Sequence, residues 1–385
     1  MKSPGAAIES DLGIRIRVRP PAARPVVRVH IVFAHPSHDS FTGRVLGELL
    51  RGLAAAGHVV TLSDLYASGF NPVMSREQYV RETRYSCDLP VPEDVAREQA
   101  RLDAAQVWVF VYPVWWTDCP AILKGWFDRV WSVGYAYAPG QHDISPQLSA
   151  RRMKVAEKAM VVCTAGHTVE ALRDSGCYDA MYTTMIDDRL AGRARQTEFH
   201  VLAGSSDLPP ADWVAHRLSC LTTAFELGRD MRYRTYLEMN SPDWLVPARG
   251  DRPVTMKQIE GVEVRALTQE VGRPWGWHRA WGAVTWAEHL GNPTLRHYRL
   301  EVGGQPVGVA TYNLENWRTV EIDSFGLLPQ VIGHGLGGPC LTETVRRAWA
   351  DGATRVWLHT STADHPNALP NYLARGFRPF DPLER

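Results

Sequence analysis

The chain has 385 residues, of which 45% are hydrophobic and 22% charged, so it is long enough for two or three domains and too apolar for extensive disorder. Its 42 basic side chains are balanced by 42 acidic ones, which excludes the net charge that attracts nucleic acid or an anionic membrane. The six cysteines form no C-x-x-C pair, which argues against a disulfide framework or a zinc ribbon, and we expect no metal. Because no secretory signal or membrane-spanning run is visible, we expect a cytoplasmic protein.

Strands and helices alternate through the first 230 residues. Residues 1–26, rich in arginine and proline, predict a flexible leader. The β-branched run from Val26 predicts a buried strand, and the leucines that follow it predict a helix that Gly57 ends. Further strands are expected at 58–62, 107–113, 158–166 and 198–204, with helices at 121–131 and 211–230. This α/β pattern predicts a doubly wound parallel sheet of flavodoxin type over residues 27–231, with its ligand at the carboxyl ends of the strands.

A second ordered pattern follows a break in periodicity. Residues 232–261 are rich in turn formers and charges and predict a linker. Beyond them we expect a hairpin with a Gly-Gly turn, a strand at 319–328, a glycine-rich loop, a helix and a strand at 355–361. Residues 262–385 therefore predict a second, separate α/β domain.

Two segments of the first domain lie at predicted strand ends. The segment from His35 to Thr42 leads into a helix, whose N-terminal amides and hydroxyls suit a cofactor phosphate, although Ser40 or Thr42 is equally explained as a helix cap. Trp115 and Trp116 follow the third strand. A planar cofactor, a dimer partner or core packing would each cover these two side chains, and the residues leave the three alternatives open.

Three segments carry a family resemblance. FAHPSHDSF, DLYASGFNPVMSREQY (64–79) and VYPVWWTDCPAILKGWFDRVWSVGYAY (111–137) resemble the NAD(P)H:quinone reductases, flavin-dependent diaphorases with a flavodoxin-like fold, and the likeness covers roughly residues 27–230. The resemblance implies a bound flavin, FAD in preference to FMN, which NADH or NADPH reduces before an electron acceptor takes the same seat. It also implies a homodimer that shares the flavin site.

The same resemblance implies roles for individual residues. One set would hold the phosphate side of the flavin: His35, Ser40, Phe41 and Thr42. A second set would line the isoalloxazine ring and donate backbone amides to it: Pro113, Val114, Trp115 and Trp116. Thr164 and Gly166 lie in the place of the family's Thr-Thr-Gly-Gly loop, from which His167 departs. His167 and Tyr178 are the candidates for proton delivery to the acceptor; an exposed loop residue and a packing aromatic are the alternatives.

A glycine-rich turn opens a helix in the second domain. Its backbone amides would converge on a phosphate, although a ligand-free tight connection is the alternative, and its spacing does not fit the Rossmann G-x-G-x-x-G. The turn resembles the Gln/Arg-x-x-Gly-x-Gly loop of the GNAT acetyltransferases, and 365–377 resembles their Asn…Tyr-x-x-x-Gly-Phe motif. The resemblance, over about 262–385, implies acetyl-CoA between the strands at 319–328 and 355–361. The residues that would hold it are Leu327, Gln330, Val331, Gly333, Gly335, Gly337, Gly338 and Asn367.

Acetyl transfer needs a base for the amine and an acid for the leaving thiolate. By the same resemblance Tyr372 fits the acid. Glu321 is the preferred base and Asp323 the second candidate, because strand alternation places both carboxylates on one face; rim charges and a packed tyrosine are the alternatives. Tryptophans 275, 277, 281 and 286 fall where such folds build the acceptor pocket, and core packing explains them equally well.

The two resemblances together predict a bifunctional enzyme with small-molecule substrates. The first domain would be a flavin-dependent NAD(P)H oxidoreductase for a quinone or nitrogen-containing acceptor. The second would be an acetyl-CoA-dependent N-acetyltransferase for a small amine or hydrazine, in one biosynthetic or detoxification pathway. The alternative is that the flavin domain is a redox sensor or scaffold and that only the acetyltransferase turns over.

Overall fold

The chain divides into two compact units at the boundary between Tyr233 and Arg234. The computed structural model describes residues 7–9, 15–17, 26–87, 89–137, 152–203, 210–249, 253–277, 281–316 and 318–380. Where the sequence predicts a flexible leader, β1 (Ala7–Glu9) and β2 (Arg15–Arg17) form an antiparallel pair, and the other residues up to 25 lie outside the described ranges. Within those ranges, no helix is long and apolar enough to cross a membrane.

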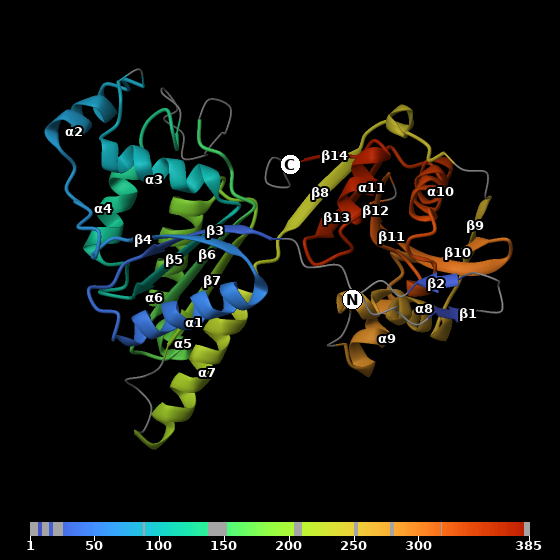
Figure 1. The fold of residues 1–385 in the computed structure, drawn as a ribbon, viewed down its shortest axis with the longest axis horizontal. Coiled ribbons are helices and arrows are strands. Elements are labelled where there is room, and N and C mark those ends of the chain that lie inside the picture. Colours follow the sequence, from blue (N-terminus) through green and yellow to red (C-terminus); the bar gives the residue numbers. More distant parts are fainter. Residues whose placement is uncertain are drawn as a thin grey trace, which may run out of the picture. The chain divides into compact units, whose positions relative to one another are not determined.

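The first unit is built on a five-stranded parallel sheet with the order β4-β3-β5-β6-β7 (Figure 1). Its strands are β3 (Arg28–Phe33), β4 (Val59–Asp64), β5 (Val107–Pro113), β6 (Lys158–Thr164) and β7 (Thr197–Leu202). Every residue of β5 and β6 is buried, as expected for central strands covered by helices on both faces. The five strands and the flavodoxin-like topology predicted from the sequence are confirmed.

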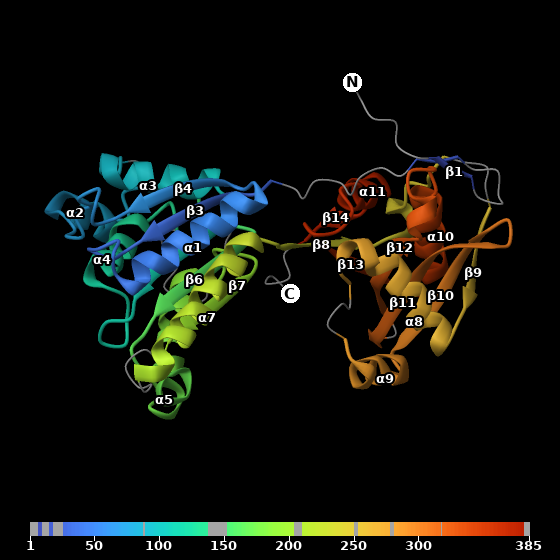
Figure 2. The same ribbon diagram turned by 60° about the horizontal axis from the view of Figure 1, so that its bottom comes forward.

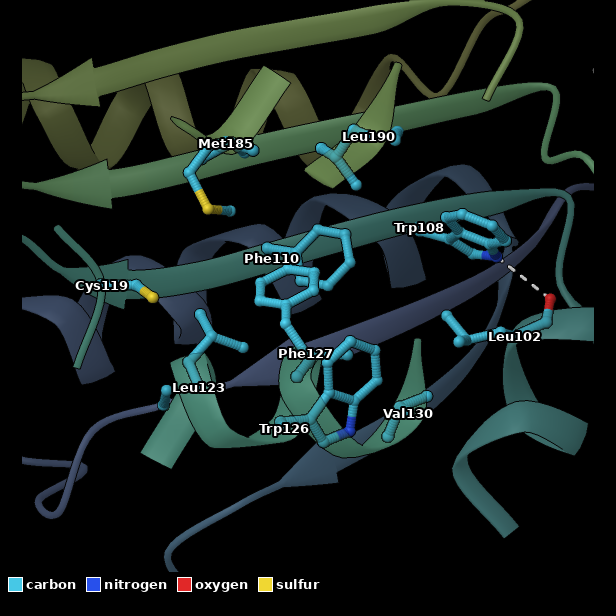
Figure 3. Packing of buried hydrophobic residues seen from close by; sticks show 14 of the residues in the cluster. Leu102, Trp108, Phe110, Cys119, Leu123, Trp126, Phe127, Val130, Met185 and Leu190 are labelled. Carbon is cyan, nitrogen blue, oxygen red and sulfur yellow. Dashed lines mark hydrogen bonds between the residues drawn. The ribbon is translucent and has the colours of Figure 1, made fainter. Parts of the chain in front are cut away.

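Helices cover both faces of this sheet. On one face α1 (Phe41–Ala56) packs with α7 (Pro210–Arg229). On the other face α3 (Glu93–Ala104), α4 (Ala121–Val130) and the π-helix η1 (Thr183–Leu190) form an aromatic core, in which the Trp108 indole donates to the carbonyl of Leu102 at 3.0 Å (Figure 3). The remaining helices are α2 (Arg76–Thr83), α5 (Val169–Asp174) and α6 (Cys177–Tyr182). Ser40 caps α1 and Gly57 ends it with a φ of 76°.

The second unit contains a mixed seven-stranded sheet with the order β14-β8-β13-β12-β11-β10-β9. Its strands are β8 (Arg234–Met239), β9 (Val254–Gln258), β10 (Leu295–Val302), β11 (Gln305–Asn316), β12 (Thr319–Leu327), β13 (Arg355–Ser361) and β14 (Arg378–Pro379). The segment 232–261, predicted as a linker, therefore supplies two strands. The charges of β8 disguised it, since Glu238 is buried and pairs with Arg355 at 2.8 Å.

Helices lie on both faces of the second sheet as well (Figure 2). They are α8 (Val262–Gly272), α9 (Ala283–Gly291), α10 (Gly337–Ala350) and α11 (Ala368–Ala374), with 3₁₀ turns at Pro242–Trp244, Arg273–Trp275 and Pro329–Val331. On one face the Tyr312 hydroxyl donates to the Thr344 carbonyl of α10; on the other Val271 of α8 packs against Val309. Strands β12 and β13 pair in parallel as far as Ile322 opposite Leu358.

Candidate active sites

A cavity of about 410 Å³ lies in the second unit, beyond the last paired residues of β12 and β13. This volume falls within the range of about 300–1,000 Å³ that small-molecule sites occupy. Of the residues predicted to act on acetyl-CoA, seven line it: Leu327, Gly333, Gly335, Gly337, Gly338, Asn367 and Tyr372. Gln330, Val331, Glu321 and Asp323 are not among its lining residues.

The glycine-rich turn forms one end of this cavity. Gly333 and Gly335 have φ angles of 89° and 76°, in the left-handed region that favours glycine, and α10 begins two residues later at Gly337. Backbone amides at such a helix start suit an anion. A Cβ on Gly338 would lie 2.5 Å from Nη1 of Arg375, so this guanidinium stands beside the helix start. The sequence analysis missed Arg375, whose signal was a basic residue directly before the Gly-Phe of the motif.

Tyr372 lies on α11 and is buried between Phe325 and Phe377, with ring centroids 6.4 and 6.2 Å away. Burial, and then the charge of Asp364, raise the pKa of Tyr372 well above its usual value. Its hydroxyl is therefore protonated at neutral pH. That state suits the predicted role of proton donor to a leaving thiolate.

The two candidate bases lie farther along β12. Glu321 accepts a hydrogen bond from Asn313 Nδ2 at 3.1 Å and stands 3.5 Å from Nδ1 of His359, whereas Asp323 accepts from the Ser324 hydroxyl at 2.8 Å. At about 3.3 Å per strand residue, they lie about 13 and 7 Å from Phe325, the nearest β12 residue of the cavity wall. The register with β11 also shifts at Asp323, which interrupts the alternation used to place both on one face.

The predicted tryptophans divide between the cavity and the core. Trp275 and Trp277 line the cavity, and Trp286 is 1% exposed within the fold. Asp364 and His365, which follow β13, also line it. The sequence analysis assigned no role to Asp364, because nothing local to it indicates that a tryptophan 87 residues away will reach it.

In the first unit, the hydroxyls predicted to face a phosphate are used within the protein. Ser40 Oγ accepts from the Gly43 amide at 3.0 Å and donates to the Ser37 carbonyl at 2.7 Å, as a helix cap. The buried Thr42 hydroxyl lies 2.7 Å from that of Thr164, which joins the ends of β3 and β6. The groups available to an anion at this helix start, near Phe41, are therefore backbone amides.

The two tryptophans of the first unit lie on a tight turn after β5. The Trp115 amide donates to the Asp118 carbonyl at 2.9 Å, and the Val114 amide donates to the Thr164 carbonyl at 2.8 Å. These amides are thus committed to the backbone, and the prediction that they donate to a flavin ring is wrong for both. Trp116 has a φ of 52° and a fully exposed side chain, and the His35 and Trp115 rings lie 6.1 Å apart.

An ion pair that the sequence analysis missed holds this turn. Arg189 of η1 binds both carboxylate oxygens of Asp118 at 2.9 and 3.0 Å, and its guanidinium lies 5.3 Å from the centroid of the Phe127 ring. Burial alone would raise the pKa of Asp118, but the hydrogen bonds and charge of Arg189 hold that pKa below its ordinary value. The turn is therefore anchored to the core of the first unit.

His167 and Tyr178 occupy different surroundings. His167 is exposed in the loop after β6, beyond Gly166. Tyr178 packs edge-on against Phe199 at 5.6 Å, and the Arg173 guanidinium lies 4.8 Å from its ring. The environment of Tyr178 is that of a packing aromatic, and the predicted proton delivery by either residue stays a prediction.

Comparison with known proteins agrees with both architectures. A flavodoxin-like fold family model matches residues 27–188, and the model of the acetyltransferase (GNAT) family matches residues 263–377. The ribosyldihydronicotinamide dehydrogenase [quinone] of Pongo abelii is 31% identical over 163 residues, which cover 39% of this chain and 68% of that protein. The chain joins a flavodoxin-like NAD(P)H quinone oxidoreductase domain to a GNAT acetyltransferase domain.

Two further relatives match the oxidoreductase domain. NAD(P)H dehydrogenase [quinone] 1 of Rattus norvegicus is 37% identical over 125 residues, covering 29% of this chain and 46% of that protein. A solved NAD(P)H:quinone oxidoreductase from Methanothermobacter marburgensis is 40% identical, with coverage of 53% of this chain and 96% of that one and a TM-score of 0.47. The chain spans about half the length of the first curated relatives that it matches, 46% and 48%. Flavin and NAD(P)H are typical of the first family, and acetyl-CoA of the second.

Proposed function

We propose that the protein is a bifunctional enzyme. Its first domain would transfer electrons from NADH or NADPH, through a flavin, to a quinone or a nitrogen-containing acceptor. Its second domain would transfer the acetyl group of acetyl-CoA to a small amine or hydrazine. The observation that carries the second activity is the cavity beyond the β12–β13 pairing, which combines a left-handed glycine turn with a protonated tyrosine.

For acetyl transfer, the amides at the start of α10 and the guanidinium of Arg375 would bind the phosphates of CoA. Leu327 and Asn367 would flank the pantetheine chain, and Tyr372 would protonate the sulfur as the carbon–sulfur bond breaks. Glu321 is the proposed base. Because it lies beyond the cavity and touches Asn313 and His359, it would receive the amine proton through water.

For electron transfer, the amides at the start of α1 would bind the flavin phosphate, with His35 and Phe41 beside them. Pro113, Val114, Trp115 and Trp116 would line the ring, which when bound supplies the hydride chemistry. The anchored turn supports this role, because Asp118 and Arg189 fix an exposed indole at the carboxyl edge of the sheet. We also propose a homodimer, since a second copy would cover the fully exposed Trp116.

Native mass spectrometry of the purified protein, with and without acetyl-CoA, tests both cofactor assignments. We expect a mass increment of FAD, or else of FMN, and a further increment of one acetyl-CoA per chain, on a dimer. Trp115→Ala should release the flavin, while Trp244→Ala, in the other domain, should retain it. Protein purified with wild-type chain stoichiometry that binds neither compound when both are supplied would contradict the proposal.

A redox sensor is the second candidate for the flavin domain. It is favoured by the packing role of Tyr178, which leaves proton delivery to the acceptor without an obvious donor on α6. Stopped-flow reduction of the flavin by NADPH distinguishes the two functions. Bleaching and reoxidation by a quinone on the timescale of turnover supports the reductase; no bleaching supports the sensor.

A further inference from the structure

The wall of the acetyltransferase cavity opposite its glycine turn has a composition of its own. It is formed by Val271, Trp275 and Trp277 at the end of α8 and by Asp364 and His365 after β13. The α8 side packs tightly against the sheet, since a Cβ on Gly326 would lie 2.4 Å from Val271 and 3.3 Å from the Trp277 ring. This wall is therefore flat, apolar and rigidly placed.

Asp364 fixes one of its indoles. Its Oδ1 accepts from the Trp277 indole at 3.2 Å, and its Oδ2 accepts from the Thr360 hydroxyl at 2.9 Å and from the Ser361 amide at 2.7 Å. Three donors and no acceptor on this group are what an ionised carboxylate requires. Because a carboxylate offers about four acceptor positions, one remains for a ligand.

The charge of the wall is as specific as its shape. Among the described residues that line the cavity, Asp364 alone has a formal charge. His365 does not compete with it, because burial lowers the pKa of His365 and its Nδ1 accepts from the Asn367 amide at 3.0 Å, which leaves the proton of the neutral ring on Nε2. The His365 ring in turn meets Trp275 edge-on, with centroids 5.2 Å apart.

We propose that Trp275, Trp277 and Asp364 form the acetyl-acceptor subsite and that it selects an amine carried on a planar aromatic group. Two indoles offer stacking surfaces to a ring, and the carboxylate attracts the ammonium. The same carboxylate repels the phosphates of CoA, so the donor enters with its phosphates at the glycine turn and its thioester toward this wall. The inference rests on the proposed acetyltransferase activity and names its substrate class.

The reaction balances without a further reagent. The bound ammonium first loses one proton to water, and its nitrogen lone pair then forms the bond to the thioester carbonyl carbon. As the carbon–sulfur bond breaks, the sulfur takes the Tyr372 proton and the nitrogen loses a second proton to water, which restores the tyrosine. The products are an N-aryl- or N-arylalkyl acetamide and CoA.

The first test uses the unmodified protein. Thiol release from acetyl-CoA is compared for 2-phenylethylamine, hexylamine and spermidine, with acetyl-CoA binding measured separately by calorimetry. We expect kcat/KM for 2-phenylethylamine to exceed both others about tenfold, and uncharged 2-phenylethanol to compete at least about tenfold more weakly. Binding of acetyl-CoA with equal or better turnover of hexylamine or spermidine, or with no turnover of any, overturns the inference alone. Failure to bind acetyl-CoA refutes the proposed function itself.

Variants test the two parts of the wall. Asp364→Asn should raise KM for 2-phenylethylamine about tenfold while the Kd of acetyl-CoA stays within about twofold, and Trp277→Leu should remove the preference over hexylamine. Asp351→Asn is the matched control, because it also removes a carboxylate but from an exposed pair with Arg347 on α10. An Asp364→Asn protein that retains wild-type KM contradicts the subsite. If this variant does not fold, the comparison of 2-phenylethylamine with 2-phenylethanol decides.

Discussion

Replacing Gly335 by alanine isolates the contribution of the glycine turn to acetyl-CoA binding. The φ of Gly335 is 76°, and a Cβ there would meet no atom within 4 Å, so the substitution adds backbone strain without a clash. An L-residue pays about 1–2 kcal/mol in the left-handed region. We expect the alanine variant to relax out of it and to recover the bound conformation only at that cost. The Kd of acetyl-CoA should therefore rise about 5- to 30-fold.

Gly352→Ala is the control for this experiment. Gly352 lies in the turn after α10, has a φ of 97° and likewise has open space around its Cα, but it does not line the cavity. Both variants should lose about 1–2 kcal/mol of domain stability, whereas only Gly335→Ala should weaken binding, as measured by titration calorimetry at constant ionic strength. Equal affinity of Gly335→Ala and wild type, or equal weakening by Gly352→Ala, would refute the reasoning.

Three more predictions concern single charged groups. Arg375→Gln should weaken acetyl-CoA binding and flatten its salt dependence, because the lost guanidinium stands beside the start of α10; an unchanged salt slope in calorimetry would exclude this phosphate contact. Asp118→Asn should destabilise the first domain by about 3 kcal/mol, since it leaves the buried Arg189 without its counter-ion, and flavin fluorescence should report release; retention of both flavin and urea midpoint would contradict it. Burial lowers the pKa of His30 from 6.5 to about 4, so its stabilising contribution is present above pH 6.5 and is lost as the pH falls to 4, at about 3 kcal/mol; hydrogen exchange of β3 should accelerate beyond its intrinsic rate, and His30→Gln should abolish that slope.

Local patterns were sufficient to predict most of the elements. The strands β5 and β6 read as apolar runs because both of their faces are buried, and Gly57 marks the end of α1 because only a left-handed residue closes that helix. The strand β8 escaped prediction for the opposite reason. Its Glu238 is stabilised by Arg355, 117 residues away, and a charge that pairs so far along the chain reads locally as loop.

The sites followed the same division. The glycine turn and Tyr372 were identified from motif resemblance, since their neighbours in sequence are also their neighbours in space. The bonds that complete each site join distant segments: Thr42 meets Thr164, and Arg189 reaches Asp118. Only the topology of the parallel sheet brings such strand ends together, so a reading of local spacing cannot pair them.

Both domains solve one problem in the same physical way. Each places tryptophans on a loop near its candidate site, where large apolar side chains without support would collapse inward or lose their position. In each an aspartate anchors that loop: Asp118 is fixed by Arg189, and Asp364 fixes Trp277. Multiple hydrogen bonds to one carboxylate restrict a loop more than apolar contact does, because they are directional. Ligand binding then meets an indole already in place, so less ordering entropy opposes binding than a loop without an anchor would impose.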